Sequence, residues 1–306
     1  MRDVIIIGSG PAGYTAGIYT ARAGLKPLLI ASSVEAGGEL MKTTEVENFP
    51  GFPEGLMGPE LMGHFQAQAE RFGTEILMDD VVEVDLTGDV KIVKTGAGET
   101  FEAKTVILAT GAAYRELGLP REKDLSGRGV SWCATCDGFF FKEKAIAVVG
   151  GGDSAMEEAT FLTRFGTKVY LIHRRDHFKA SKIMADRALN NPKIEVIYNS
   201  EIAELKGDAK LEAVTLRSTV DGTESNLDLD GLFIAVGNDP RVWLVENQVE
   251  LTPERFIQVE GRSSRTSIPG VFACGDVIDP TYRQAITAAG SGCVAALDAE
   301  HYLSGH

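Results

Sequence analysis

Cysteine and positive charge are both scarce in this sequence. It has 4 cysteines in 306 residues, too few for a secreted disulfide scaffold, and a close cysteine pair in a reducing compartment is typical of a metal site or of catalysis. The 30 lysines and arginines are outnumbered by 44 acids, which gives a net charge of −14, whereas a nucleic-acid-binding protein usually has a basic face. The excess of acidic residues therefore predicts a protein without a nucleic-acid partner.

Long apolar runs are missing as well. No run approaches the roughly 18 residues that a membrane helix needs, and the N-terminal MRDVIIIGSG is too short and too closely bounded by glycine for a signal peptide. The sequence therefore predicts a cytoplasmic protein without a membrane partner. Its length suggests about two domains, and its 34 glycines predict many tight turns.

One structural unit occurs twice. Residues 3–30 align with residues 145–172 without a gap, at an offset of 142 that places Gly8 on Gly150. Each copy has an apolar strand, a glycine-rich turn, a helix, a glycine stop and a second apolar strand, which is the pattern of a βαβ dinucleotide-binding unit. The sequence thus predicts an α/β fold with two Rossmann-like dinucleotide-binding domains.

The glycines have distinct roles in such a unit. The first permits a sharp turn, the second permits close approach of the backbone to a pyrophosphate, and the third position must be small so that the helix can pack on the strand. The pyrophosphate lies at the helix N-terminus, where free N–H groups attract anions. These positions are Gly8, Gly10 and Gly13 in the first copy and Gly150, Gly152 and Ala155 in the second.

The residues after the second strand of each copy indicate which dinucleotide binds. In the second copy HRRDHFK brings together His173, Arg174, Arg175 and Lys179, a cluster suited to the 2′-phosphate of NADPH. In the first copy the sequence ASS has no acid to hold a ribose, so this position leaves the ligand open. FAD is the economical choice because NADPH needs an electron acceptor before a disulfide can be reduced.

The pair Cys133 and Cys136, in WCATCDG, has three interpretations. The first is a zinc site, since the spacing of Cys133 and Cys136 and that of His173 and His177 both suit zinc ligands. However, 36 residues separate Cys136 from His173, whereas a zinc finger has about 12–15 between its two ligand pairs. A structural disulfide would close a ring too small to constrain the unfolded chain much. A redox pair is favoured because in CxxC one thiolate attacks and the other resolves.

Taken together, these motifs resemble the low-molecular-weight thioredoxin reductases of bacteria over nearly the whole chain. The motifs are GSGPAG, TEVENFPGF, ILATGA, WCATCDG, GGGDSAMEEATFLTRF, HRRD and GDVIDPTYRQAITAAGSGCVAALDAE. The resemblance implies an FAD domain in two pieces, 1–114 and 243–306, and an inserted NADPH domain, 115–242, that carries the cysteines. Larger disulfide reductases have their cysteines just after the first dinucleotide unit, where GGELMKTTEVENFPGF has none.

The resemblance also implies site residues. Those expected at FAD are Gly8, Gly10, Pro11, Ala12, Gly13, Gly38, Glu39, Asn48, Thr110, Gly111, Asp276, Arg283, Gln284 and Ala285. Those expected at NADPH are Gly150, Gly152, Asp153, Ser154, Ala155, His173, Arg174, Arg175 and Lys179. The chain departs from the family pattern twice, with Glu39 where Gln is usual and Lys179 where a third Arg is usual.

The implied activity is the reduction of thioredoxin by a homodimeric flavoprotein. NADPH passes hydride to the flavin, the flavin reduces the disulfide at Cys136, and Cys133 attacks thioredoxin while Asp137 acts as acid–base. The cysteine pair and the nicotinamide both need the same face of the flavin. The resemblance implies that the inserted domain rotates to bring each of them there in turn. Two alternatives stay open: an NADPH-dependent flavoprotein that reduces another disulfide or redox acceptor, and a non-catalytic redox sensor.

Overall fold

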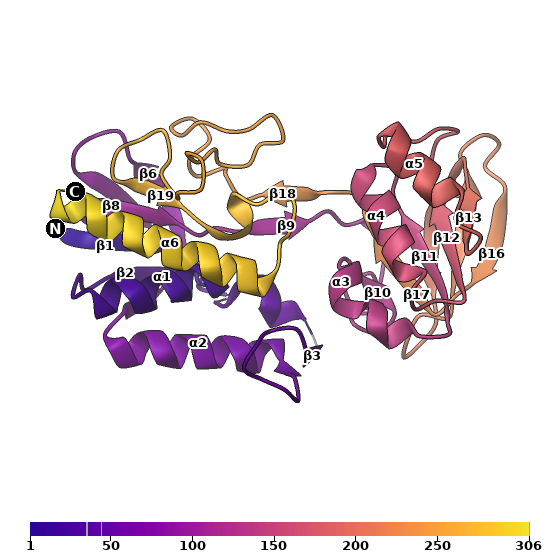
Figure 1. Cartoon of the computed structure of the whole chain (residues 1–306), viewed down its shortest axis with the longest axis horizontal. Coiled ribbons are helices and arrows are strands. Elements are labelled where there is room, and N and C mark those ends of the chain that lie inside the picture. The colour runs from indigo at the N-terminus through magenta and orange to yellow at the C-terminus, as the bar shows by residue number, and fades with distance from the viewer. Residues whose placement is uncertain (35, 44, 306) are drawn as a thin grey trace. The chain divides into compact units, whose positions relative to one another are not determined.

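The computed structural model describes residues 1–34, 36–43 and 45–305. The chain forms two compact units (Figure 1): a split unit, Met1–Ala113 with Asp239–His306, and an inserted unit, Tyr114–Asn238. The predicted domain boundaries, after residues 114 and 242, lie one and four residues further along the chain than the boundaries of these units. The chain passes from one unit to the other through two short strands, β9 (Ala112–Tyr114) and β18 (Asn238–Pro240).

The split unit is built on one mixed sheet in the strand order β5-β2-β1-β8-β7-β6, with β19 also paired to β8. The pairs β5–β2, β2–β1, β1–β8 and β8–β19 are parallel, and β7 pairs antiparallel with β8 and β6. Its strands are β1 (Arg2–Ile7), β2 (Leu28–Ala31), β5 (Glu75–Met78), β6 (Val81–Asp85), β7 (Lys91–Thr95), β8 (Thr100–Leu108) and β19 (Val271–Ala273). A hairpin of β3 (Glu45–Val46) and β4 (Leu56–Met57) lies apart from this sheet.

Helices cover one face of this sheet. In Figure 1 the long C-terminal helix α6 runs alongside α1, and α2 lies beyond α1. A Cβ atom on Gly292 of α6 would lie 2.1 Å from the carbonyl oxygen of Ala12, so only glycine permits the two helices to approach this closely. The helices and 3-10 turns of the unit are α1 (Pro11–Arg22), η1 (Gly38–Lys42), α2 (Gly58–Phe72), η3 (Gly275–Val277) and α6 (Ala285–Ser304).

Strand β1 is apolar at successive positions because both faces of the sheet are covered. Val4 and Ile6 belong to the cluster beneath α1 and α6, whereas Ile5 and Ile7 belong to the cluster on the opposite face. All four side chains are buried, and burial of such a side chain contributes about 1.5–3 kcal/mol. This strand fixes the position of the glycine turn that follows it.

The inserted unit repeats the parallel arrangement in the order β10-β17-β11-β12-β13. A separate antiparallel sheet has the order β14-β15-β16. The strands are β10 (Val130–Ser131), β11 (Ala145–Val149), β12 (Lys168–Ile172), β13 (Ile194–Ile197), β14 (Ser200–Lys206), β15 (Ala213–Ser218), β16 (Glu224–Asp228) and β17 (Gly231–Ile234). The helices are α3 (Ala134–Asp137), η2 (Gly138–Phe141), α4 (Asp153–Leu162) and α5 (Lys182–Leu189).

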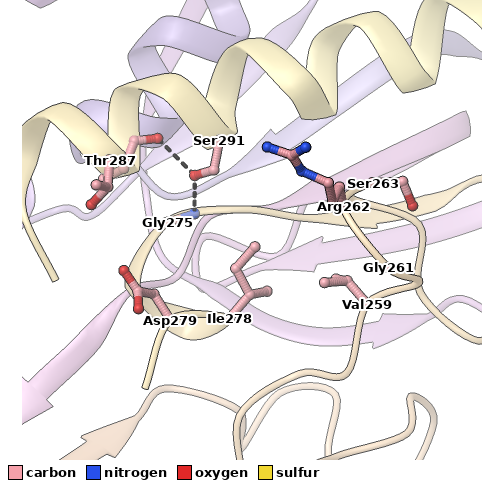
Figure 2. Close-up of a pocket in the computed structure, with 10 residues that line it drawn as sticks. Val259, Gly261, Arg262, Ser263, Gly275, Ile278, Asp279, Thr287 and Ser291 are labelled. Carbon is pink, nitrogen blue, oxygen red and sulfur yellow. Dashed lines mark hydrogen bonds between the residues drawn. The ribbon is translucent and has the colours of Figure 1, made fainter. Parts of the chain in front are cut away.

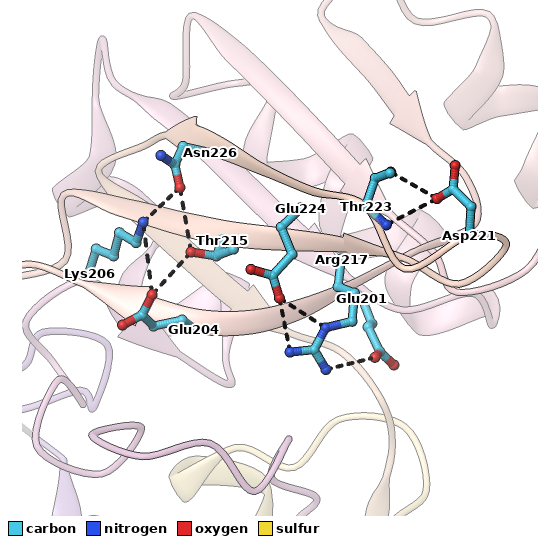
Figure 3. Close-up of polar contacts among 9 residues, drawn as sticks. All are labelled: Glu201, Glu204, Lys206, Thr215, Arg217, Asp221, Thr223, Glu224 and Asn226. Atoms are coloured by element: carbon cyan, nitrogen blue, oxygen red, sulfur yellow. Dashed lines mark hydrogen bonds and ion pairs between the residues drawn. The ribbon is translucent and has the colours of Figure 1, made fainter.

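The antiparallel sheet has one apolar and one polar face, as such sheets commonly do. Leu205, Val214 and Leu216 pack into the core of the inserted unit. On the polar face, shown in Figure 3, Arg217 pairs with both Glu201 and Glu224. These ion pairs are exposed and therefore contribute little to stability, so the apolar face is what holds the sheet in place.

The structure confirms the predicted fold class: two Rossmann-like units, the second inserted into the first. Each has a glycine turn between a parallel strand and the helix that follows it, β1 to α1 and β11 to α4. None of the helices in the described ranges has the length and apolar character to span a bilayer.

Candidate active site

The first glycine turn leaves open space at the start of α1. Gly8 has a φ of +110°, and a Cβ there would lie 2.2 Å from the carbonyl oxygen of Ala109. A Cβ on Gly13 would lie 1.9 Å from the oxygen of Gly8, whereas a Cβ on Gly10 would meet nothing within 4 Å. Gly10 begins α1 without a side-chain cap. The first and third glycines thus serve the fold, and the second leaves room where the helix N–H groups point.

Other residues predicted at FAD contact this turn or one another. A Cβ on Gly38 would lie 3.3 Å from Cα of Gly10, so the loop of η1 packs directly on the turn. The Asn48 amide donates to Oε1 of Gln284 at 3.2 Å, which joins segments 236 residues apart. The structure therefore brings parts of the predicted set together from both pieces of the split unit.

Asp276 lies in η3, just after β19, and is largely buried. Burial, together with the negative charge of Asp279, raises the pKa of Asp276 to about 6, and Arg283 partly offsets this. A carboxyl group with this pKa is mostly ionised at pH 7 but can also exchange protons near neutrality. Its partly exposed position at the end of a parallel strand suits an acceptor for a ligand hydroxyl group.

Helix α6 begins later than the sequence indicates. The sequence predicts a helix from about Arg283, but α6 starts at Ala285 with Gln284 as its N-cap. Arg283 instead has a φ of +48°, because the Asp279 carboxylate accepts the backbone N–H groups of Thr281, Tyr282 and Arg283 and so forms a tight turn. The predicted residues Arg283 to Ala285 therefore lie in a turn and a helix start.

A cavity of about 310 Å³ lies beside the first turn of α6, and Figure 2 shows its lining. Ser291 of α6 accepts a hydrogen bond from the N–H of Gly275 at 2.8 Å, next to Asp276. No residue of the predicted site lines this cavity. One of its lining residues, Gly275, nevertheless lies against the first turn, since a Cβ there would be 2.9 Å from the Cβ of Ala12.

The second glycine turn resembles the first. A Cβ on Gly150 would lie 2.4 Å from the oxygen of Ala235, whereas one on Gly152 would meet nothing within 4 Å. Gly152 begins α4, again without a side-chain cap. Ala155 at the third position is fully buried against Gly150. This turn therefore has the same open space at a helix start.

The basic segment after β12 folds back onto this second turn. The N–H groups of Lys179 and Ala180 both donate to the oxygen of Gly151, at 2.8 and 3.0 Å. The carboxylate of Asp153 accepts the N–H of Ser181 at 2.6 Å. These bonds hold the predicted cationic residues beside the helix start, and the side chains of Arg174, Arg175, Lys179 and Ser154 are exposed there.

His173 differs from its cationic neighbours because it is buried. Its side chain fills the space in front of Gly151, where a Cβ would lie 2.1 Å from the ring. Its Nε2 has no hydrogen-bond partner among the described residues. Burial lowers the pKa of His173, so the ring is neutral at pH 7 and attraction for an anion comes from the arginines.

Cys133 and Cys136 are joined by a disulfide at the start of α3. Cys136 is exposed and Cys133 is half-buried. The Cys133 sulfur accepts the Cys136 N–H at 3.3 Å and lies 3.4 Å from the Thr135 hydroxyl. Within residues 1–34, 36–43 and 45–305 no group of three or more His, Cys, Asp or Glu side chains is arranged to hold a metal ion, and the two sulfurs are bonded to each other.

Ser131 links the disulfide to Asp137, and the sequence did not identify it. Its hydroxyl donates to the Asp137 carboxylate at 2.6 Å and accepts the Cys133 N–H at 3.1 Å. Burial raises the pKa of Asp137, and the Ser131 hydrogen bond opposes this rise. A serine before CxxC has no distinctive pattern, so only the fold reveals this arrangement.

Comparison with known proteins agrees with this geometry. The sequence matches the family described as pyridine nucleotide-disulphide oxidoreductase over residues 2–292. The chain belongs to this family. It is 62% identical over 304 residues to the thioredoxin reductase of Streptomyces clavuligerus, covering 99% of this chain and 94% of that one.

Two further relatives extend the comparison within the family. The bifunctional thioredoxin reductase/thioredoxin of Mycobacterium leprae is 54% identical over 306 residues, covering 100% of this chain and 67% of that protein. The solved structure of the thioredoxin reductase from Giardia duodenalis superposes with a TM-score of 0.94 at 44% identity, covering 99% of this chain and 100% of that one. The resemblance stated from the sequence motifs is confirmed.

Proposed function

We propose that this chain is an NADPH-dependent thioredoxin-disulfide reductase. The observation that carries the proposal is the Cys133–Cys136 disulfide on a dinucleotide-binding unit that is itself inserted into a second such unit. Two dinucleotides and one disulfide are the parts needed to carry electrons from a nicotinamide to a protein disulfide. Relatives over 50% identical along the whole chain bear the name thioredoxin reductase.

The split unit binds FAD and the inserted unit binds NADPH. The open space at Gly10 and the uncapped start of α1 fit a pyrophosphate, and the partly exposed carboxyl group of Asp276 fits a ribityl hydroxyl. The equivalent space at Gly152 lies beside Arg174 and Arg175, whose charges fit a 2′-phosphate. The remaining FAD contacts are assigned to Pro11, Ala12, Gly38, Asn48, Thr110, Gly111, Gln284 and Ala285.

Bound FAD would take hydride from NADPH and deliver two electrons to the disulfide. The chain's own chemistry then begins with two free sulfurs. The Cys136 N–H and the Thr135 hydroxyl lie within reach of the Cys133 sulfur, and such donors favour its thiolate. Cys133 therefore attacks the thioredoxin disulfide and forms a mixed disulfide, and Cys136 attacks the Cys133 sulfur, which releases reduced thioredoxin and restores the disulfide.

Asp137 handles the proton in this exchange. Each thiolate that leaves a disulfide must gain a proton to become a thiol, and a carboxyl group whose pKa is raised is a suitable donor. Asp137 is anchored by Ser131, which also holds the backbone of Cys133. This places the donor on the same short segment as both sulfurs.

Thioredoxin is the proposed protein partner, and the protein acts as a cytoplasmic homodimer. Tyr19 of α1 and Val294 and Leu297 of α6 are exposed apolar side chains on two helices that pack together. Such a surface suits contact with a second copy. Equilibrium sedimentation tests the dimer.

The proposed activity is tested by an absorbance spectrum followed by a coupled assay. The purified protein should be yellow, NADPH should bleach the flavin band under anaerobic conditions, and oxidised thioredoxin should restore it. A colourless protein that FAD does not colour contradicts the enzyme proposal. A flavoprotein that oxidises NADPH with another disulfide or redox acceptor, but not with thioredoxin, would instead support the alternative acceptor.

Replacing Gly10 by alanine should weaken FAD binding without unfolding the protein. The added Cβ meets no protein atom within 4 Å but occupies the space proposed for the pyrophosphate, so the dissociation constant should rise by about tenfold or more. Fluorescence titration of the FAD-free protein measures it. The matched variant Gly13→Ala places a Cβ 1.9 Å from a backbone oxygen, so thermal unfolding should show a loss of about 1–3 kcal/mol or more. Equal FAD affinity in Gly10→Ala and in the unchanged protein would contradict the site.

Replacing Ser131 by alanine should move the pH dependence of thioredoxin reduction to higher pH. The hydrogen bond to the carboxylate lowers the pKa of Asp137, so its loss raises that pKa and keeps the carboxyl group protonated to higher pH. The rate falls as pH rises through this pKa, and the fall should therefore begin later in the variant. Rate–pH profiles measure this, with Ser131→Thr as the variant that keeps the hydroxyl. Identical profiles for Ser131→Ala and the unchanged protein would remove Ser131 from the proposal.

A further inference from the structure

Arg241 joins three segments of the split unit just after β18. Its backbone N–H donates to the oxygen of Gly111 at 2.9 Å, and its own oxygen accepts the Thr110 hydroxyl at 2.8 Å. Its guanidinium group forms an ion pair with Glu39 of η1. One residue thus connects the turn after β8, the η1 loop and the chain that returns from the inserted unit.

The Glu39–Arg241 pair lies at the edge where the proposed FAD residues gather. Glu39 directly follows Gly38, which packs on Gly10. A Cβ on Gly111 would lie 3.4 Å from a guanidinium nitrogen of Arg241. Both charges affect Asp276, because Glu39 raises its pKa and Arg241 lowers it. The pair therefore belongs to the same electrostatic environment as Asp276.

This pair is less exposed than the Lys94–Glu83 ion pair of the same unit. The side chains of Arg241 and Glu39 are 36% and 27% exposed, whereas those of Lys94 and Glu83 are 44% and 62% exposed. Charges that are shielded from water interact more strongly with their surroundings than charges on the surface. The exposed pair Lys94–Glu83 on β7 and β6 is thus a suitable internal control.

We propose that Arg241 is a positioning residue that neutralises Glu39 at the flavin edge and thereby sets how readily the bound FAD is reduced. The proposal rests on the proposed binding of FAD by the split unit. Reduction adds electrons, so an uncompensated carboxylate nearby opposes it and an uncompensated guanidinium favours it. Because Arg241 is also bonded to Thr110 and Gly111, its charge is held in place beside Glu39.

The test measures the ratio of reduced to oxidised FAD against a reference dye in the purified holoprotein. Arg241→Gln should shift this ratio about three- to tenfold toward oxidised FAD at a fixed potential, and tenfold corresponds to about 30 mV. Glu39→Gln should shift it by a similar factor toward reduced FAD. The double variant should return to within about threefold of the unchanged protein, and Lys94→Gln should not move the ratio.

Two outcomes overturn the proposal. One is that Arg241→Gln and Glu39→Gln shift the ratio in the same direction, and the other is that Glu39→Gln leaves it unchanged within error. Glu39→Gln keeps every backbone bond of Arg241, so it decides the matter even if Arg241→Gln fails to fold. A wild-type protein that holds no FAD would instead contradict the proposed function, which the spectrum shows before any variant is made.

Discussion

Replacing either Cys133 or Cys136 by serine is expected to lower NADPH-dependent thioredoxin reduction on the order of a thousandfold or more. A serine oxygen cannot form the mixed disulfide or the internal disulfide on which both half-reactions depend. FAD reduction by NADPH should persist in both variants because neither cysteine contributes to either glycine turn. Steady-state assays with thioredoxin and anaerobic spectra with NADPH alone measure the two properties separately.

The matched control is Cys293→Ser in α6, because Cys293 is a free cysteine that is not fully buried. Cys274 is less suitable, since burial raises its pKa to about 12 and its replacement would alter the core. Cys293→Ser should retain thioredoxin reduction within about twofold. Normal turnover in Cys133→Ser or Cys136→Ser would refute the redox assignment of the pair.

Replacing Arg174 and Arg175 together by glutamine is expected to raise the Michaelis constant for NADPH at least tenfold. Both side chains are exposed beside the second glycine turn, and each charge-assisted bond to a phosphate contributes about 1.5–3 kcal/mol. NADH has no 2′-phosphate, so its use should change little. Steady-state kinetics with both nucleotides measures the preference.

The matched control is Arg187→Gln on α5, an exposed arginine of the same unit. It should leave both Michaelis constants unchanged. Lys179→Ala should have a smaller effect than the double variant. Lys179→Arg should strengthen NADPH binding, because a planar guanidinium group can donate two hydrogen bonds to one phosphate. The contribution should shrink at high salt. If the double variant keeps the original preference, HRRDHFK is a solvated basic surface.

The fold was predictable because the residues it requires at each turn are determined by nearby atoms. A sharp turn at Gly8 and a small residue at Gly13 and Ala155 are demanded by a few neighbouring atoms, as the short Cβ distances show. The apolar strand before each turn follows from burial on both faces. Such requirements repeat in the sequence, so the two βαβ units and the α/β class could be recognised from spacing alone.

The finer features of the site depend on contacts between distant segments. Glu39 was predicted near FAD, but its partner Arg241 is 202 residues away, and no local pattern relates them. Ser131 is close to Asp137 in sequence, yet its role depends on how α3 turns back toward β10. The start of α6 was misplaced because the Asp279 carboxylate forms a turn whose hydrogen bonds compete with helix formation.

The most direct test of the account is a count of thiols after reduction by NADPH. The oxidised holoprotein should be treated anaerobically with one equivalent of NADPH, alkylated and analysed by peptide mass spectrometry. The account predicts new alkylation at Cys133 and Cys136, with Cys274 and Cys293 unchanged, and loss of the new label when oxidised thioredoxin is added before alkylation. Alkylation of Cys133 and Cys136 that is the same with and without NADPH would contradict it.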